Sequence, residues 1–439
     1  MMCLKTMPPE YRIRFLPMER TIPAEEGEDL LEIAMKAGVH INASCGGRGV
    51  CGKCRVRMTE GTLNSSTHPS ISEEDYAAGM RLACVSTVSS DAVIEIPLES
   101  QVDRSVLRRS TVMSDVDAGG IDEVLLGEYG REPLVERFNL DIHRPDAQDN
   151  VSDAARIARA LASEPGCGES VMLPLRVMRG LGARLRDAGW SVTVDVVMSG
   201  RKEITSITKV DAGASHCAIA VDIGTTTVAA QLLSCDREDG EGIILASSSD
   251  YNRQISFGED VISRIMYAGK LSGLKKLQEV VVSTVNLLIG ELLEETGVDR
   301  ADISHVVVAG NTTMMHLFYG IEPKYIMLAP YTPLATAFPP IDCGEAGLET
   351  APHTRLFAIP GVSSYVGGDI VSGVALSGMT ERDGVSLFMD IGTNGELVLG
   401  NGQWLLCASC SAGPAFEGGG IEFGTRAARG DVVVWTDVD

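Results

Sequence analysis

The sequence predicts a multidomain protein of the α/β and α+β classes, and three observations lead to that fold class. A motif that reads as strand, turn and strand occurs twice, as VDIGTTTVAAQL at residues 221–232 and as MDIGTNGELVL at residues 389–399. Three cysteines share one glycine-rich loop near the N-terminus. A polar stretch without hydrophobic periodicity, residues 99–130, separates these regions. At 439 residues the chain can hold roughly two to four domains.

Each copy of the repeated motif is an apolar run that ends in aspartate and continues as Ile-Gly-Thr and a second run. We expect a hairpin, because glycine lets the backbone turn and approach a ligand closely. Hydroxyl, amide and backbone N–H groups of such a turn can donate to a phosphate. The leading carboxylate, Asp222 or Asp390, can hold Mg²⁺ through water. One D-x-G turn is ordinary hairpin chemistry. Two matching copies predict a duplicated fold that binds one nucleotide from both sides.

The overall composition excludes several classes of partner. The net charge of −23 argues against nucleic acid and against an anionic membrane surface, since both attract clustered Lys and Arg. No apolar run reaches the ~20 residues of a spanning helix, and the N-terminus lacks a signal-peptide pattern. The eleven cysteines are mostly clustered at short spacings, which favours metal ligation in a reducing compartment over disulfides. We therefore expect a cytoplasmic protein.

Residues 11–98 are predicted to form one compact unit around a cysteine loop. The pattern predicts a hairpin, an amphipathic helix, a strand, a short helix capped by Ser72 and a closing strand. Its four cysteines follow the spacing C-x5-C-x2-C-x29-C. Plant-type [2Fe–2S] ferredoxins use the similar spacing C-x4-C-x2-C with a distant fourth cysteine. Zinc is the alternative, but zinc sites normally use two short cysteine pairs. The spacing therefore predicts a [2Fe–2S] cluster.

The polar residues 99–130 have the composition of a linker, which would let the cluster unit swing between an electron donor and an acceptor. Residues 131–210 are expected to form a small middle unit of two helices followed by two strands. Nothing in that unit has a catalytic spacing. We interpret its basic side chains as a solvated helix face rather than as a docking patch; they are Arg176, Arg179, Arg184 and Arg186.

Residues 216–439 contain both hairpins and further turns between them. The predicted strand HVVVAG ends in Gly-Asn-Thr-Thr, so that Asn311 and Thr312 can form the floor of a phosphate site. A helix N-cap role alone is the alternative for Asn311. The turn in YVGGDI places Asp369 near a helix start. The lone C-x2-C pair, Cys407 and Cys410, has no second pair, which favours buried thiols over a metal site.

The order of the motifs resembles that of the reductive activators of corrinoid proteins. The motifs that carry the resemblance are CGGRGVCGKC, AVDIGTTT, GEDVISRI, VAGNTTM, VGGDI, MDIGTNGE and SAGPAFEGGGI. The resemblance covers nearly the whole chain and implies four parts. These are an N-terminal β-grasp [2Fe–2S] ferredoxin-like domain, a linker, a small α/β middle domain, and an actin-like ATPase domain built from a duplicated RNase H-like subdomain.

The same resemblance implies ATP-dependent reductive activation of corrinoid (cobalamin) methyltransferase-system proteins, in which one electron passes from the cluster to Co(II) and regenerates Co(I). The implied cofactors are a [2Fe–2S] cluster, ATP and Mg²⁺. The implied partners are a corrinoid protein or cobalamin-dependent methyltransferase and a low-potential electron donor, and a homodimer is compatible with it. The expected catalytic residues are Asp222 and Asp390. The expected cluster ligands are Cys45, Cys51, Cys54 and Cys84. The expected nucleotide-binding residues are Gly224, Thr225, Thr226, Thr227, Asn311, Thr312, Gly392, Thr393, Asn394, Gly395 and Glu396.

The second copy of the subdomain has barely begun where the sequence stops at Asp439. We therefore expect a C-terminally truncated member of the family, with an incomplete second subdomain that lacks several strands and helices. The adenosine-binding segment of the family would lie in the missing part, so weak nucleotide affinity is expected.

Two other functions are compatible with these motifs. A [2Fe–2S] electron-transfer protein without ATP coupling needs only residues 11–98. A kinase-like ATPase needs only the two hairpins, and it has no use for a fused cluster. The effect of ATP on the reduction of a Co(II) corrinoid protein distinguishes the activator from the simple electron carrier.

Overall fold

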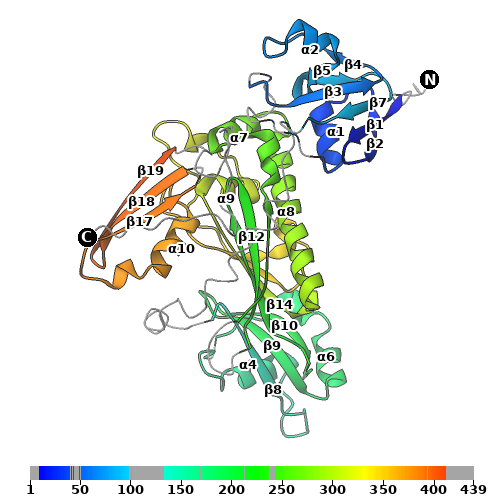
Figure 1. Cartoon of the computed structure of the whole chain (residues 1–439). Coiled ribbons are helices and arrows are strands. Elements are labelled where there is room, and N and C mark those ends of the chain that lie inside the picture. The colour runs from blue at the N-terminus through cyan, green and yellow to red at the C-terminus, as the bar shows by residue number, and fades with distance from the viewer. Residues whose placement is uncertain are drawn as a thin grey trace, which may run out of the picture.

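The computed structural model arranges the chain in separate sheets with their own cores, which confirms the predicted multidomain fold (Figure 1). The predicted linker lies outside the described residues, apart from Ser100. The structure describes residues 9–39, 41, 43, 49, 51–97, 100, 133–168, 170–211, 213–236, 243–392 and 394–411. Among these residues no helix combines the length and the hydropathy that a membrane span requires.

The first part, called the ferredoxin unit below, is a five-stranded mixed sheet in the order β2-β1-β7-β3-β5, beside a small β4–β6 pair. Strands β1 and β7 are parallel, and α1 packs against the sheet, as in a β-grasp fold. Asp29 caps α1 and Ser72 caps α2, because their side chains accept hydrogen bonds from backbone N–H groups of the first turn. The elements are β1 (Glu10–Leu16), β2 (Arg20–Glu25), α1 (Leu30–Lys36), β3 (Arg55–Glu60), β4 (Leu63–Ser65), α2 (Glu73–Ala77), β5 (Met80–Leu82), β6 (Ser86–Val88) and β7 (Ala92–Glu95).

The middle unit is an antiparallel sheet in the order β10-β9-β8 with three helices. The sequence predicted β9, β10 and the helices but not β8. Two arginines of the predicted solvated face form ion pairs within this unit: Arg176 pairs with Glu203 at 2.6 Å, and Arg186 pairs with Asp153 at 2.8 Å. The elements are β8 (Val135–Asp141), α4 (Asp153–Leu161), α5 (Leu175–Met178), α6 (Leu181–Asp187), β9 (Ser191–Val197) and β10 (Glu203–Lys209).

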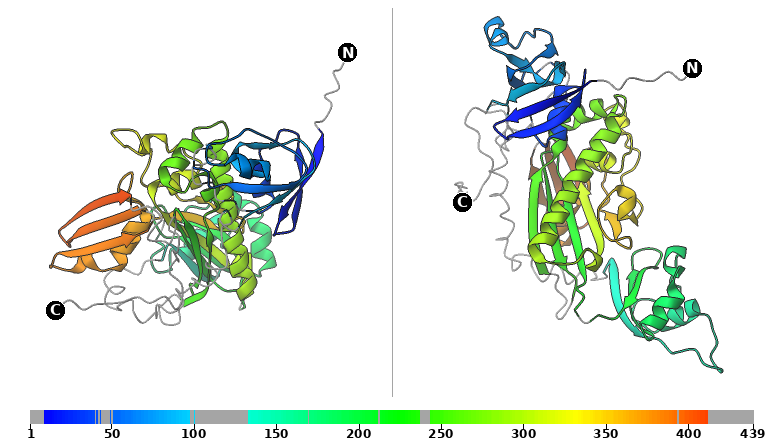
Figure 2. Two further views of the ribbon diagram at one scale, coloured as in Figure 1. Left: turned by 45° about the horizontal axis from the view of Figure 1, so that its top comes forward. Right: turned by 90° about the vertical axis from the view of Figure 1, so that its right-hand side faces the viewer.

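The first subdomain is a six-stranded sheet in the order β13-β12-β11-β14-β16-β15, with β11 parallel to β14 and antiparallel to β12. The long helix α8 lies along one face and buries an apolar stripe of helical period against it (Figure 2). The elements are β11 (Cys217–Ile223), β12 (Thr227–Ser234), β13 (Ile243–Tyr251), α7 (Val261–Ala268), α8 (Gly273–Thr296), β14 (Ile303–Gly310), α9 (Thr312–Phe318), β15 (Ile341–Asp342) and β16 (Arg355–Ala358).

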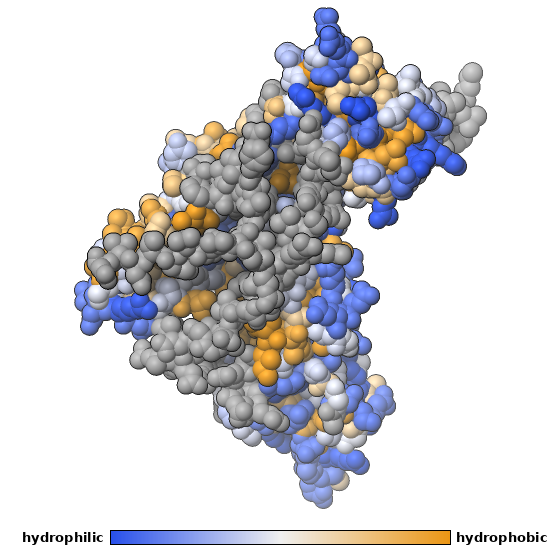
Figure 3. All heavy atoms as spheres, in the orientation of Figure 1, coloured by the Kyte–Doolittle hydropathy of each residue, from blue (hydrophilic) through white to orange (hydrophobic). Residues whose placement is uncertain are grey.

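The second subdomain is an antiparallel meander, β17 (Ser386–Ile391), β18 (Asn394–Asn401) and β19 (Trp404–Ser411), next to α10 (Gly368–Leu376). Figure 3 shows apolar residues at the surface of this part, at the left of the view. The exposed apolar side chains of this subdomain include Leu387, Met389, Leu405 and Leu406. The interpretation of Cys407 and Cys410 as buried thiols is wrong for Cys410, which is exposed, while Cys407 is half-buried.

Helix α8 offers a direct test of the packing. Leu288 is fully buried against the six-stranded sheet, whereas its neighbour Leu287 is 38% exposed. We expect Leu288→Ala to lower the free energy of unfolding by about 2–5 kcal/mol, because it removes buried methyl groups and leaves a cavity. Leu287→Ala is the matched control and should cost less than about 1 kcal/mol. Urea unfolding followed by circular dichroism measures both, and equal losses would contradict the assignment of the buried face.

Candidate functional site

Both Asp-Ile-Gly-Thr hairpins face one cavity of about 200 Å³. The first hairpin joins β11 to β12, and the second joins β17 to β18. The cavity is lined by Asp222, Gly224, Thr225, Thr226, Thr227, Asn311, Asp369, Asp390, Gly392, Asn394 and Glu396. The structure therefore brings most of the expected nucleotide-binding residues together from both subdomains.

The first hairpin is a tight turn that the surrounding chain holds in place. A Cβ atom on Gly224 would lie 2.7 Å from the Thr227 carbonyl oxygen, so the turn needs glycine there. The Asn252 side chain donates to the Gly224 carbonyl at 2.8 Å. The Asn252 backbone N–H donates to the Thr226 carbonyl, also at 2.8 Å. Asn252 thus fixes both ends of the turn, and its place in the NRQ segment gave no sign of this role.

Asn311 is the N-cap of helix α9 and also lines the cavity. Its side-chain oxygen accepts from the Met314 N–H at 2.9 Å, which caps helix α9. Its side-chain nitrogen donates to the Thr225 hydroxyl at 3.0 Å, which ties the helix start to the first hairpin. Thr312 lies elsewhere: its hydroxyl donates to the Ser363 carbonyl, and it is not among the residues that line the cavity.

In the second hairpin Asp390 lies opposite Glu396, and Ile391 lies opposite Gly395. The Gly392 N–H donates to the Asn394 carbonyl at 2.9 Å, which closes the turn. Gly395 belongs to the strand and is not among the lining residues. The expected site residue Thr393 lies outside the described residues.

Four carboxyl groups around the cavity make it strongly acidic. The Asp222 side chain is open to the cavity, and partial desolvation by the cavity walls, together with the charges of Asp369 and Asp390, raises its pKa to about 7. Burial raises the pKa of Glu396 to about 7 and that of Asp369 to about 6. Asp369 was not among the expected site residues, although its position after two glycines at a helix start is a signal that could have identified it. Such a cavity favours a cation.

Mg²⁺ fits this donor set only together with a ligand. Among the described residues no three His, Cys, Asp or Glu side chains form a group that could hold a metal ion by themselves. Mg²⁺ usually keeps several waters and binds through one or two carboxylates plus the phosphates of a substrate. Asp222 and Asp390, one from each hairpin, are carboxylates of this kind.

The cysteine loop brings two thiols together in the ferredoxin unit. The Sγ atoms of Cys54 and Cys84 lie 3.2 Å apart, and both side chains are buried. Cys51 is half-buried, and Cys45 lies outside the described residues. Gly52 has φ +70° and no room for a Cβ, which would lie 2.6 Å from the Ser70 side chain. Two buried thiols in contact, with a third cysteine three residues before Cys54 in the chain, fit the ligand chemistry of an iron–sulfur cluster.

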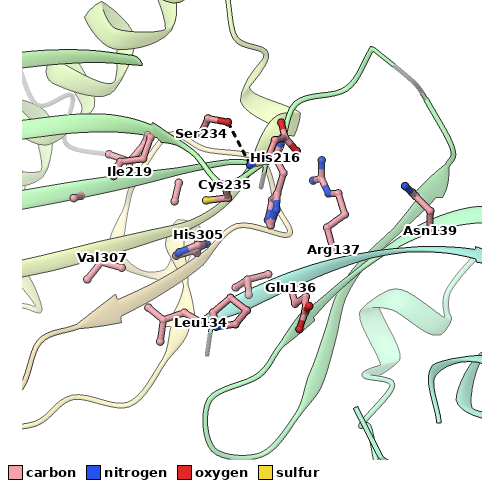
Figure 4. Close-up of a pocket in the computed structure, with 16 residues that line it drawn as sticks. Leu134, Glu136, Arg137, Asn139, His216, Ile219, Ser234, Cys235, His305 and Val307 are labelled. Atoms are coloured by element: carbon pink, nitrogen blue, oxygen red, sulfur yellow. Dashed lines mark hydrogen bonds between the residues drawn. The ribbon is translucent and has the colours of Figure 1, made fainter. Parts of the chain in front are cut away.

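A larger cavity, of about 690 Å³, lies where β8 of the middle unit meets β11 and β14 (Figure 4). Polar side chains of its lining are bound to buried neighbours behind the wall. Arg137 pairs with Asp195 at 2.7 Å, and the Ser304 hydroxyl lies 2.9 Å from ring nitrogens of both His216 and His305. Burial lowers the pKa of His305 to about 4, so its ring is neutral at neutral pH. We interpret this network as structural.

Comparison with known proteins matches the chain region by region. Residues 13–89 match the 2Fe-2S iron–sulfur cluster binding domain, and residues 127–216 match the RACo linker region. Residues 217–382 match the RACo middle region, and residues 384–436 match the C-terminal domain of RACo, the ASKHA domain.

Individual relatives agree with these matches. Corrinoid activation enzyme RamQ of Eubacterium limosum is 27% identical over 425 residues, which are 96% of this chain and 64% of RamQ. The [Co(II) methylated amine-specific corrinoid protein] reductase of Methanosarcina barkeri is 26% identical over 231 residues, or 49% of this chain and 39% of the reductase.

A solved structure of a reductive activator for corrinoid, iron–sulfur protein is 38% identical, with a TM-score of 0.64. The similarity covers 96% of this chain and 66% of that one, so the chain spans a little less than two thirds of the length of RamQ and of this activator. The ferredoxin unit, the middle unit and both subdomains thus have counterparts in the same order, and the chain belongs to the family of reductive activators of corrinoid proteins, RACo.

Proposed function

We propose that the protein activates corrinoid proteins reductively with the help of ATP and returns their cobalt from Co(II) to Co(I). The observation that carries the proposal is the acidic cavity that both hairpins line, in a chain that also pairs the thiols of Cys54 and Cys84. The names of the relatives, a corrinoid activation enzyme and a Co(II) corrinoid protein reductase, support the choice of substrate.

The cluster ligands in this proposal are Cys45, Cys51, Cys54 and Cys84. When bound, a plant-type [2Fe–2S] cluster supplies a one-electron couple with a reduction potential of about −400 mV. The chain buries Cys54 and Cys84, which keeps water from that side of the site and so influences the potential. We also propose that a low-potential electron donor reduces the cluster and that the protein works in the reducing cytoplasm. The proposed domain limits are 11–98, 131–210 and 216–439.

In the nucleotide site, the donors of the Thr225–Thr227 turn and of Asn394 would bind the phosphates, and Asp222 and Asp390 would hold Mg²⁺; all of these residues line the cavity. Phosphoryl transfer to water then depends mainly on positioning and charge stabilisation. Glu396 suits the proton transfer, because a pKa of about 7 lets its carboxylate accept a proton from the attacking water.

Nucleotide binding between two subdomains can also provide the driving force for a difficult reduction. Each ~59 mV of mismatch in a one-electron couple costs a factor of ten at equilibrium. A ligand that binds one arrangement of the subdomains better than another shifts the population toward it. Such coupling favours the ATP-dependent activator over a simple electron carrier.

Replacing Cys51 tests the cluster assignment. We expect Cys51→Ala to abolish the visible absorption of the [2Fe–2S] cluster, because one iron loses a thiolate ligand. Cys407→Ala is the matched control, since Cys407 lies half-buried on β19 in the second subdomain, and its spectrum should stay unchanged. Absorption and iron content measure both. Cluster loss in the Cys407 variant would contradict the assignment.

Replacing Asp222 tests the ATP site. We expect Asp222→Asn to reduce Mg²⁺-dependent ATP hydrolysis at least about 100-fold, by the loss of a metal-binding carboxylate, with the cluster spectrum intact. Asp383→Asn is the control, because Asp383 is exposed on the loop before β17. The decisive assay follows reduction of a Co(II) corrinoid protein with and without ATP. If ATP does not change the extent of Co(II) reduction by the wild type, the ATP-dependent activator is contradicted in favour of the simple electron carrier.

The raised pKa values predict how binding depends on pH. Mg²⁺ needs the ionised carboxylates, so protons compete with the metal below about pH 7, near the pKa of Asp222. We expect MgATP affinity to rise with pH and to level off above about pH 7, with up to about a tenfold change per pH unit below it. Calorimetric titration across this range measures the profile. A profile that is flat through this range would show that these groups do not bind the metal.

A further inference from the structure

The ferredoxin unit contacts the first subdomain next to the cysteine loop. Lys53, between Cys51 and Cys54 in the sequence, pairs its ammonium with the Glu259 carboxylate, Nζ to Oε2, at 3.2 Å. Met35 of α1 packs against the cores of both parts. Figures 1 and 2 both place the ferredoxin unit beside α7 and the start of α8. The docked position thus sets the cysteine loop against the segment that leads into α7.

That segment is tightly packed. Glu259 lies between Gly258 and Asp260, the residue that caps α7 by accepting from the Ser263 N–H at 2.7 Å. A Cβ atom on Gly258 would lie 2.3 Å from the Ser263 hydroxyl oxygen, so the backbone has no free space there. A shift of Glu259 must therefore move the neighbouring Gly258 carbonyl as well.

Arg264 connects this segment to the first hairpin. Its Nε donates to the Gly258 carbonyl at 2.9 Å, and its Nη2 donates to the Thr225 carbonyl at 2.5 Å. Its Nη1 donates to the Gln254 side-chain oxygen at 3.2 Å. The side chain is fully buried, these three acceptors are neutral, and the Asp260 carboxylate acts on the guanidinium only at longer range. A buried cation held only by neutral acceptors is costly, so its retention calls for a reason.

We propose that Arg264 is a positioning residue that couples nucleotide binding at the Thr225 turn to docking of the ferredoxin unit through Glu259 and Lys53. This inference rests on the proposed function, since it takes the acidic cavity as the nucleotide site. Phosphates that bind the turn displace the Thr225 carbonyl, and the planar guanidinium passes the displacement to Gly258, because its donors are fixed relative to one another. By thermodynamic linkage, docking of the ferredoxin unit then changes the affinity for nucleotide by the same factor as bound nucleotide changes the equilibrium constant of docking.

The charge of Arg264 supports this role. Burial lowers its pKa to about 9, so the guanidinium remains charged at neutral pH. It lies directly behind the turn and offsets part of the negative charge of the cavity, which favours a polyphosphate.

A double-mutant cycle on MgATP binding to the holo-protein tests the coupling, with calorimetry as the measurement. The cycle combines Lys53→Gln with Arg264→Lys. We expect Lys53→Gln alone to change the dissociation constant about 1.5- to 5-fold, the range of one exposed ion pair, and to have no effect in the Arg264→Lys background. The control cycle combines Lys53→Gln with Arg253→Lys. Arg253 lies in the neighbouring 3-10 helix and pairs with Asp250, so this cycle should be additive.

The outcomes separate the inference from the proposed function. An equal effect of Lys53→Gln in the wild-type and Arg264→Lys backgrounds overturns the coupling and leaves ATP binding intact. Failure of the wild type to bind MgATP overturns the proposed function, and the inference with it. If Arg264→Lys does not fold, hydrogen exchange of residues 51–56 replaces the cycle. MgATP must change that exchange in the wild type and not in Glu259→Gln, and any other result overturns the coupling.

Discussion

The central position of strand β11 constrains the rest of the structure. It pairs with β12 on one side and with β14 on the other along its full length, so its last residues cannot move independently. Asp222 and Gly224 are fixed in this way at the end of a strand that is buried in the sheet. The close approach of Gly224 to Thr227 then sets the turn, and Asn311 reaches it from the end of β14. The geometry of the cavity follows from the pairing of one strand.

Because the chain has a net charge of −23, binding a polyphosphate must overcome the repulsion between the acidic protein and the phosphates. The cavity carries carboxylates of its own, and desolvation and their mutual repulsion raise the pKa of Asp222 and that of Glu396. Two features oppose the repulsion: backbone and hydroxyl donors of the turns, which have no net charge, and the buried guanidinium of Arg264. Mg²⁺ would supply the rest, and so the metal and the nucleotide are expected to bind together.

Local signals in the sequence predicted much of this structure. Each hairpin has the alternation, the aspartate and the glycine of its turn in one short run, and the cysteine spacing is equally local. Strand β8 was not predicted, because it is held by pairing with β9 and by the contact of Arg137 with the buried Asp195, 58 residues away in the sequence. The roles of Asn252 and Arg264 depend on contacts between distant segments, which periodicity and spacing do not encode. Asp369 faces the cavity only because α10 packs beside β14.

The exposed thiol of Cys410 has a practical consequence. Cys410 lies opposite Gly395 on the neighbouring strand, and its Sγ contacts the Gly395 carbonyl at 3.5 Å. Burial raises the pKa of Cys217 and of Cys343 to about 12, so both are poor nucleophiles toward alkylating reagents. A fluorophore or spin label attached at Cys410 would thus sit beside the second hairpin, where it could report movement of the two subdomains in real time.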